Sequence, residues 1–124
     1  MKLLLDTHAL LWWLDGDDRL AQEAAEVIAG AELVAVSAAS AWEISIKQAL
    51  GTLDGPVDLP AEMATNGFTE LPVTVAHALA AGALPPHHAD PFDRVLVAQA
   101  RLEGLTLVTR DARLADYGIA HLRA

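Results

Sequence analysis

The sequence predicts an α/β fold built on a short, mainly parallel β-sheet. Apolar runs of strand length alternate along the chain with longer segments that have helical caps and helical spacing of apolar residues. Strands that alternate with helices are joined by right-handed crossovers, which pair the strands in parallel and place helices on both faces of the sheet. Ligands of such sheets bind at the carboxyl ends of the strands, so we expect the functional residues there.

We expect these elements to fill one domain over residues 1–124, because no linker, repeat or low-complexity tract divides the chain. Its 53% hydrophobic residues are enough to fill a core. In chain order the pattern predicts a strand at 2–5, a helix after Thr7, a helix at 19–29, a strand at 33–36, a helix from Ser37 or Ser40 to Leu50, a helix at 60–67, a strand at 70–73, helices at 74–81 and from Pro91 to near Gly104, a strand at 106–109, a helix at 112–117 and a strand at 119–122.

Local signals set these boundaries. Side-chain oxygens that accept the first backbone N–H groups of a helix mark helix starts, and we expect Thr7 and Asp90 to be such caps, with Pro91 at the first helical position. Gly51 is typical of a helix end. The first helix carries five large apolar residues in a row at 10–14, more than one amphipathic stripe needs. We therefore expect this helix to be deeply buried or covered by another chain.

The chain is acidic, with 8 basic and 17 acidic residues and a net charge of −9. Such a field repels phosphates at long range, which weighs against a protein that holds nucleic acid through its overall charge. Divalent cations bound at an acidic cluster would reverse the charge locally, where a phosphate-bearing substrate could bind. The same acidity favours a basic partner.

The chain contains no Cys, which excludes disulfides, thiolate zinc sites and cysteine nucleophiles. A reducing compartment fits this composition, and we expect a soluble, cytoplasmic protein with no membrane segment. The uncharged stretch at 71–89 is broken by three prolines and is a poor membrane span. The apolar run after Lys2 is interrupted by Asp6, too soon for a signal-peptide core.

Four carboxylates carry the functional signal, since each lies where an apolar segment meets a helix start: Asp6, Glu43, Asp93 and Asp111. A carboxylate buried among aliphatic side chains is costly unless a cation meets it, and no Lys or Arg stands out as a counter-ion for all four. Oxygen ligands without cysteine suit Mg²⁺ or Mn²⁺, which can polarise a phosphodiester and activate water. The residues therefore indicate metal-dependent phosphodiester hydrolysis.

Two of these acids also have local explanations. Ser40 and Glu43 have the spacing of a capping box, and Glu43 stands four residues before Lys47, as in an ordinary helix ion pair. Asp111 is a good N-cap. Taken singly, these positions favour a structural role.

The other two acids fit a structural role less well. Asp6 ends a strand of leucines inside a covered sheet, where a carboxylate has little to pair with. Asp93 suits a helix dipole, but Leu96 follows it one turn on, while Arg94 and Arg101 are expected to mark the solvent face. Asp93 is therefore expected to point toward packed side chains.

Four segments together carry a resemblance: LLDTHALLWW at 4–13, SAASAWEI at 37–44, DPFDRVLVAQA at 90–100 and LVTRD at 107–111. In this order, over nearly the whole chain, they resemble the PIN-domain ribonucleases, and most closely the VapC toxins of bacterial VapBC toxin–antitoxin pairs. The resemblance implies a three-layer α/β/α PIN domain and Mg²⁺- or Mn²⁺-dependent endoribonuclease activity. It also implies a homodimer and neutralisation by a small antitoxin, which the charge suggests has a basic toxin-binding tail.

The resemblance also implies roles for the four acids. By position, Asp6, Glu43 and Asp93 match the family's metal-binding acids, and Asp111 matches a fourth, more variable one. Asp6 and Asp93 are then expected to hold the principal ion. Glu43 would help to orient the attacking water, and Asp111 would support a second ion or that water.

Other residues are expected to support the site. Thr7 and Thr109 match small hydroxyl residues beside the family's acids. Asp90 lies three residues before Asp93 and could be taken for the ligand. Asp93 is preferred because it leads directly into the apolar helix, which leaves Asp90 as a cap or supporting residue.

Cations and aromatic side chains give weaker signals. Arg110, Arg94 and Lys47 are near enough in sequence to contact phosphates, although a solvated surface position explains each of them as well. His87 and His88 follow two prolines and are expected to face solvent rather than to bind metal. The three tryptophans are expected in the core or at a subunit interface.

Two rival functions are compatible with an α/β fold that has acids at strand ends. A phosphatase or phosphotransfer domain of the aspartyl-phosphate kind would want a second Asp where this chain has His8, or a Lys where it has Thr109 and Arg110. A catalytically silent PIN-like binding module would lack one of the four acids, and none is missing.

Overall fold

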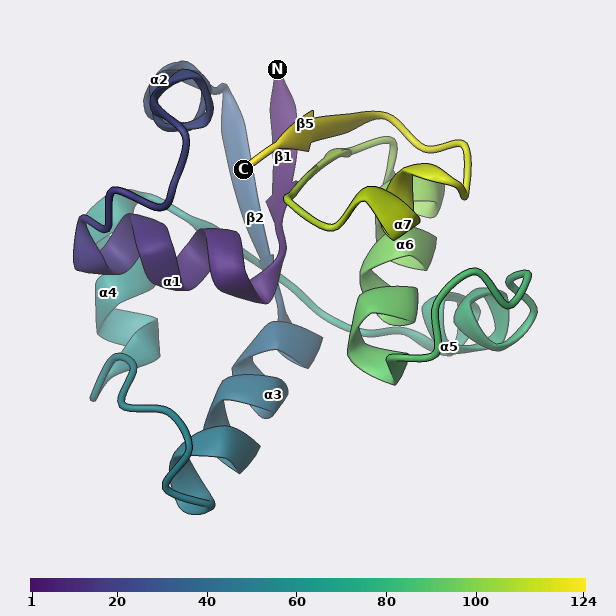
Figure 1. The fold of residues 1–124 in the computed structure, drawn as a ribbon, viewed down its shortest axis with the longest axis horizontal. Helices are drawn as coiled ribbons and strands as arrows, with labels where there is room; N and C mark the ends of the chain where they lie inside the picture. Colours follow the sequence, from purple (N-terminus) through teal and green to yellow (C-terminus); the bar gives the residue numbers. More distant parts are fainter.

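The computed structural model describes all 124 residues as five strands and seven helices (Figure 1). The strands form one sheet in the order β3-β2-β1-β4-β5, and every neighbouring pair is parallel. Their bounds are β1 (Lys2–Leu5), β2 (Leu33–Ser37), β3 (Thr69–Leu71), β4 (Thr106–Thr109) and β5 (His121–Arg123). The expectation of a short, mainly parallel sheet is confirmed.

Helices cover both faces of this sheet. Their bounds are α1 (Thr7–Asp15), α2 (Gln22–Gly30), α3 (Ala38–Ala49), α4 (Leu59–Asn66), α5 (Val75–Gly82), α6 (Pro91–Glu103) and α7 (Ala112–Ala115). Side chains alternate along β1, so Leu3 and Leu5 enter one buried cluster and Leu4 the other. The first cluster includes Leu10 of α1, and the second includes Leu96 of α6. The result is the expected three-layer α/β/α arrangement.

The order of the strands decides where the predicted acids meet. From the central strand β1 the chain builds outward through β2 and β3, and then returns to the other side of β1 to add β4 and β5. The carboxyl ends of β1 and β4 therefore border the point where the strand order reverses, which is the usual ligand site of a parallel sheet. The backbone N–H of Asp6 donates to the carbonyl of Val108 at 3.0 Å, which ties the end of β1 to β4.

Several predicted element boundaries needed correction. Asp6, not Thr7, caps α1: Asp6 Oδ1 accepts the backbone N–H of Ala9 at 2.8 Å. Ser37 caps α3, so the capping box of Ser40 and Glu43 was wrong. Helix α2 begins three residues later than predicted, and strand β3 lies one residue earlier at its start and two at its end.

The apolar helix α1 is buried mainly by its own chain. Leu10 and Leu11 are buried, and the next three residues are half-buried against the same cluster. One of the two expectations was that part of this helix is deeply buried, and Leu10 and Leu11 meet it. None of the helices combines the length and hydrophobicity needed to span a bilayer.

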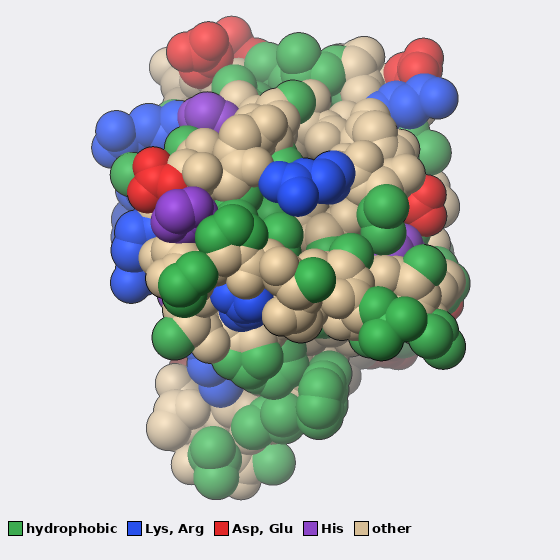
Figure 2. All heavy atoms as spheres, turned by 90° about the vertical axis from the view of Figure 1, so that its right-hand side faces the viewer, with side chains coloured by type: hydrophobic (Ala, Val, Ile, Leu, Met, Phe, Trp, Pro, Cys, Tyr) green, Lys and Arg blue, Asp and Glu red, His purple; other side chains and the backbone are tan.

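Exposed apolar side chains lie elsewhere. Figure 2 looks at the α5 side of the molecule and shows hydrophobic side chains gathered over the lower half of that face. The large hydrophobic residues with the most exposed surface include Trp42 and Leu50 near α3, Val57 before α4, and Val75 and Leu79 on α5.

Candidate metal centre

An open pocket of about 430 Å³ lies at the carboxyl edge of β1 and β4. All four acids predicted for the site line it, although they come from four different parts of the chain. The full lining is Asp6, Thr7, His8, Trp12, Glu43, Lys47, His88, Asp90, Asp93, Arg110, Asp111 and Arg113. Only one of these residues is hydrophobic, so the pocket suits a charged or strongly polar ligand.

Asp6 and Glu43 form the buried side of the pocket, with 6% and 5% of their surface exposed. Burial raises the pKa of Asp6 above its usual value, although the N–H of Ala9 and the hydroxyl of Thr109 oppose this by stabilising the carboxylate. Glu43 Oε1 accepts the hydroxyl of Thr7 at 2.6 Å. Both threonines thus contact the acids that they were expected to support.

Glu43 also makes the predicted helix ion pair. Its Oε2 lies 2.8 Å from Lys47 Nζ, one turn further along α3. Lys47 is half-exposed and lines the same pocket. The ion-pair explanation for Glu43 therefore holds together with its place in the pocket.

Burial and neighbouring acids both perturb the carboxyl group of Asp93. Its pKa is raised to about 7, first by burial and then by repulsion from Asp90 and Asp6, while His88 opposes the shift. Repulsion from acids on other elements shows that negative charge converges on Asp93.

Asp90 is held differently from Asp93. Its Oδ1 accepts the backbone N–H groups of Phe92 at 2.8 Å and Asp93 at 3.3 Å, so Asp90 is the predicted N-cap of α6. It also lines the pocket. One oxygen is therefore used at the helix start, whereas the Asp93 carboxylate is turned toward the other acids.

Asp111 is the more exposed acid of the pocket. It is the predicted N-cap of α7, and its carboxylate also pairs with the guanidinium of Arg113, Oδ2 to Nη2 at 2.8 Å. The hydrogen bond from Arg113 is the main reason why the pKa of Asp111 falls to about 2. Arg113 was not among the predicted site residues.

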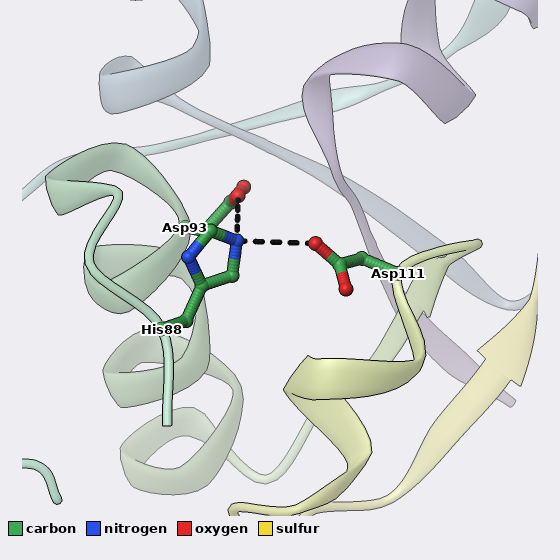
Figure 3. Close-up of side chains that lie close together, drawn as sticks. All are labelled: His88, Asp93 and Asp111. Carbon is green, nitrogen blue, oxygen red and sulfur yellow. Dashed lines mark hydrogen bonds and ion pairs between the residues drawn. The ribbon is translucent and has the colours of Figure 1, made fainter. Parts of the chain in front are cut away.

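His88 was predicted to face solvent, and this was wrong. Its side chain is 8% exposed, and Nε2 lies 3.0 Å from Asp93 Oδ2 and 3.1 Å from Asp111 Oδ2 (Figure 3). The nearest ligand-type atoms of the three residues all lie within 4.8 Å of one another. The available signal was the position of His88 two residues before the cap of α6, at the same sheet edge as the acids.

Two of the three predicted phosphate-contacting cations line the pocket, Lys47 and Arg110. The guanidinium of Arg110 also lies over the ring of Trp12, 4.6 Å from its centroid. Arg94 does not line the pocket, and its predicted solvent-facing position was wrong. Its guanidinium donates to the main-chain carbonyls of Ala81, in the last turn of α5, and of Leu84, just after that helix, at 2.9 Å each.

The residues of the pocket fit a divalent cation. Five carboxylates line the pocket against three Lys or Arg side chains. Burial and repulsion among the acids raise the pKa of Asp93, and a hard cation would relieve that repulsion. Oxygen donors of this kind suit Mg²⁺ or Mn²⁺.

Comparison with known proteins gives a consistent assignment. The PIN domain family profile matches residues 3–120. Ribonuclease VapC22 of Mycobacterium tuberculosis (strain ATCC 25618 / H37Rv) is 34% identical over 122 residues, which covers 93% of this chain and 91% of that protein.

Solved structures share the fold at lower identity. A VapBC2 structure from Rickettsia felis, bound to a DNA fragment from its promoter, matches with a TM-score of 0.69 and 13% identity, covering 98% of each chain. A toxin–antitoxin complex from Klebsiella pneumoniae matches with a TM-score of 0.63 and 24% identity, covering 89% of this chain and 87% of that one. The profile match and the 34% identical relative show that the chain belongs to the PIN-domain family, as a relative of the VapC proteins.

Proposed function

We propose that this protein is a divalent-metal-dependent endoribonuclease and the toxin of a toxin–antitoxin pair. The convergence of Asp6, Glu43, Asp93 and Asp111 on one pocket carries the proposal. The relative named as a ribonuclease and the structural neighbours described as toxin–antitoxin complexes support it. Membership of the PIN-domain family leaves the phosphatase or phosphotransfer alternative without support.

In this proposal Asp6 and Asp93 hold the principal Mg²⁺ or Mn²⁺ ion, which supplies Lewis acidity at the phosphodiester. Glu43 is held by Thr7 and Lys47 and accepts a hydrogen bond from the attacking water, which orients it. Asp111 supports a second ion or the same water.

The substrate phosphate is proposed to lie against cations on the rim of the pocket. Lys47 and Arg110 are placed to contact it, whereas Arg94 is occupied by main-chain carbonyls. Attack of water in line with the departing 3′ oxygen would leave 5′-phosphate and 3′-hydroxyl ends. Thr109, beside Asp6, helps to fix the carboxylate during this step.

The proposed protein partner is a small antitoxin with a basic toxin-binding tail. The net charge of −9 favours such a partner. An Arg or Lys of the antitoxin placed among the four acids would neutralise them in place of the metal ion. Because Leu10 and Leu11 are buried, apolar contacts on α1 would involve Trp12, Trp13 and Leu14. We also propose a cytoplasmic homodimer of single-domain chains, for which the exposed apolar surface at Trp42 and α5 is available.

A cleavage assay tests the central proposal. Purified protein should cut a structured RNA in Mg²⁺ or Mn²⁺ and stop when EDTA is added. Protein that cuts equally well in EDTA would overturn the metal dependence. Folded protein that binds Mg²⁺ but cuts no RNA would favour the alternative of a catalytically silent PIN-like binding module.

A further inference from the structure

His88 is fixed in place by contacts to each of its polar groups. Its backbone N–H donates to Tyr117 Oη at 3.0 Å, and its carbonyl accepts from Arg94 Nη1 at 3.2 Å. Its ring contacts Asp90 on one side and the two acids Asp93 and Asp111 on the other. These contacts hold both the main chain and the ring of His88 in one orientation, although the residue lies in a loop.

The contact with Asp90 determines which ring nitrogen carries the proton. The backbone N–H of Asp90 points at His88 Nδ1 across 3.1 Å. A backbone N–H can only donate, so Nδ1 must accept and is unprotonated. In the neutral ring the proton is therefore on Nε2.

The protonated nitrogen is the one that faces the acids. Nε2–H donates to Asp111 Oδ2 at 3.1 Å, and Nε2 also lies 3.0 Å from Asp93 Oδ2, which is an ion-pair distance. Asp93 is on α6, and Asp111 follows β4. One N–H group thus spans the two elements that bring these acids to the pocket (Figure 3).

The same geometry opposes direct binding of His88 to a metal ion. Ligation needs the lone pair of Nε2, so the proton would have to move to Nδ1. Nδ1–H would then face the N–H of Asp90, donor against donor, at the start of a capped helix. Asp93 faces His88 through Oδ2, and no hydrogen bond reaches its Oδ1, which can therefore bind an ion. Both oxygens of Asp111 already accept hydrogen bonds from Arg113, Oδ1 from the backbone N–H and Nε and Oδ2 from Nη2.

We propose that His88 is a positioning residue, which holds the Asp93 and Asp111 carboxylates together through its Nε2–H and is not itself a ligand of the ion. The proposal rests on the metal-dependent function given above and deepens it. It gives Asp90 a second role, because its carboxylate caps α6 while its N–H sets the tautomer of His88. Arg94 and Tyr117 anchor the main chain of His88.

Nitrogen NMR of protein labelled with ¹⁵N-histidine tests the proposal without RNA. Spectra of the metal-free and the Mg²⁺-loaded protein show which ring nitrogen carries the proton. His88→Ala assigns the signal by removing it, and His121→Ala is the matched control, because His121 is exposed on β5 and does not line the pocket. We expect Nε2 of His88 to stay protonated in both states. A proton on Nδ1 in either state would overturn the proposal.

Calorimetric binding of Mg²⁺ and Ni²⁺ gives a second readout. Loss of a residue that orients metal-binding carboxylates typically lowers metal affinity about 10- to 100-fold. His88→Ala should lower both affinities by a similar factor, because His88 is not a ligand of either ion. Loss of an imidazole ligand would instead weaken Ni²⁺ binding more than Mg²⁺ binding. His88→Gln, which offers an N–H in a similar place, should restore part of the loss, and His121→Ala should match wild type.

The outcomes separate the two proposals. A selective loss of Ni²⁺ affinity in His88→Ala, or unchanged affinity for both ions in a folded variant, would overturn the positioning role. Wild-type protein that binds Mg²⁺ with Nε2 protonated but cuts no RNA would overturn the proposed function and leave the role of His88 intact. Circular dichroism of each variant confirms that it is folded.

Discussion

Asp6, Asp90 and Asp111 each accept a backbone N–H at the start of a helix, and all three also line the acidic pocket. The two roles are compatible because a carboxylate has two oxygens, of which a cap needs one. A helix start also supplies a positive dipole end, which stabilises negative charge. Helix starts at a sheet edge can therefore hold acids close together at modest cost.

Replacing each Asp of the pocket by Asn should affect catalysis to different extents. Asp6→Asn and Asp93→Asn should each slow Mg²⁺-dependent RNA cleavage by raising its activation free energy by several kcal/mol. The amide keeps the shape of the side chain but loses the charge that binds the ion. Asp90→Asn should keep substantial activity, since Asn is also a good cap and the backbone N–H to His88 remains. Single-turnover rates measure this. Greater loss in Asp90→Asn than in Asp93→Asn would move the ligand to Asp90.

The raised pKa of Asp93 predicts a stability change in metal-free protein. Its pKa is about 7 in the folded protein against 3.8 ordinarily, so the folded state holds this proton more tightly. The proton on Asp93 therefore stabilises the folded state below about pH 4, and this contribution to the free energy of unfolding is lost as pH rises to about 7 and above. Asp93→Asn should raise the melting temperature at about pH 8 by a few degrees, since about 1 kcal/mol is worth roughly 4 °C at this size.

Thermal melts in EDTA across this pH range check the prediction. The advantage of Asp93→Asn should shrink as pH falls below about 7, where the folded wild type takes up the proton, and should be smallest below 3.8, where the carboxyl is mostly protonated in the unfolded state as well. Glu43→Gln should also be more stable than wild type if the acids repel one another. Equal melting temperatures at both ends of the range would contradict the mutual repulsion of the acids.

At the scale of elements, the side chain of Arg94 holds the irregular segment between α5 and α6 in place through hydrogen bonds to its main chain. Arg94, on the first turn of α6, donates to the carbonyls of Leu84, Pro85 and His88 in this segment and to that of Ala81 in α5. The segment has no regular secondary structure, so these bonds replace the partners that a helix or sheet would supply. Through them α6 determines where His88 lies.

Arg94→Met should therefore destabilise the protein and weaken the site. Loss of the guanidinium leaves partly buried carbonyls without a donor, at a cost of about 1–3 kcal/mol. Arg123→Met is the matched control, because Arg123 is exposed. Urea unfolding measures stability, and Mg²⁺ calorimetry measures the site. Equal stability of the two variants would show that Arg94 is not the organiser of this segment.

At the scale of the whole molecule, the negative charge determines which partners can approach. For the proposed ribonuclease, a net charge of −9 would repel RNA except near bound cations, Lys47 and Arg110. A basic protein segment is attracted by the same field that repels RNA. On the proposed function, a basic partner would therefore compete at the pocket with the metal ion and with RNA.

An antitoxin with a basic tail should compete with both Mg²⁺ and RNA. Its addition should lower the Mg²⁺ affinity measured by calorimetry, and its association rate should fall as salt screens the charges. A tail with its Arg and Lys residues replaced by Gln is the control, and it should bind more slowly and compete less. A complex whose acidic pocket stays open to solvent would contradict the competition, though not the binding.

The sequence by itself determined the layers of the fold and the acids of the pocket. Alternating short apolar strands and capped helices require parallel pairing, and parallel pairing brings the carboxyl ends of the strands to one edge. Acids that follow such strands or start the next helices must then lie near that edge. Asp6, Glu43, Asp93 and Asp111 met for this reason, and their positions needed no knowledge of side-chain contacts.

Only the tertiary structure decided the roles of His88 and Arg94. Both were expected at the surface, because nothing in their local sequence fixes the path of an irregular segment. That path depends on contacts between residues far apart in the chain, such as the bond from the N–H of His88 to Tyr117 Oη. Strand and helix periodicity reports local backbone geometry, whereas the orientation of a loop side chain is determined by the elements that pack around it.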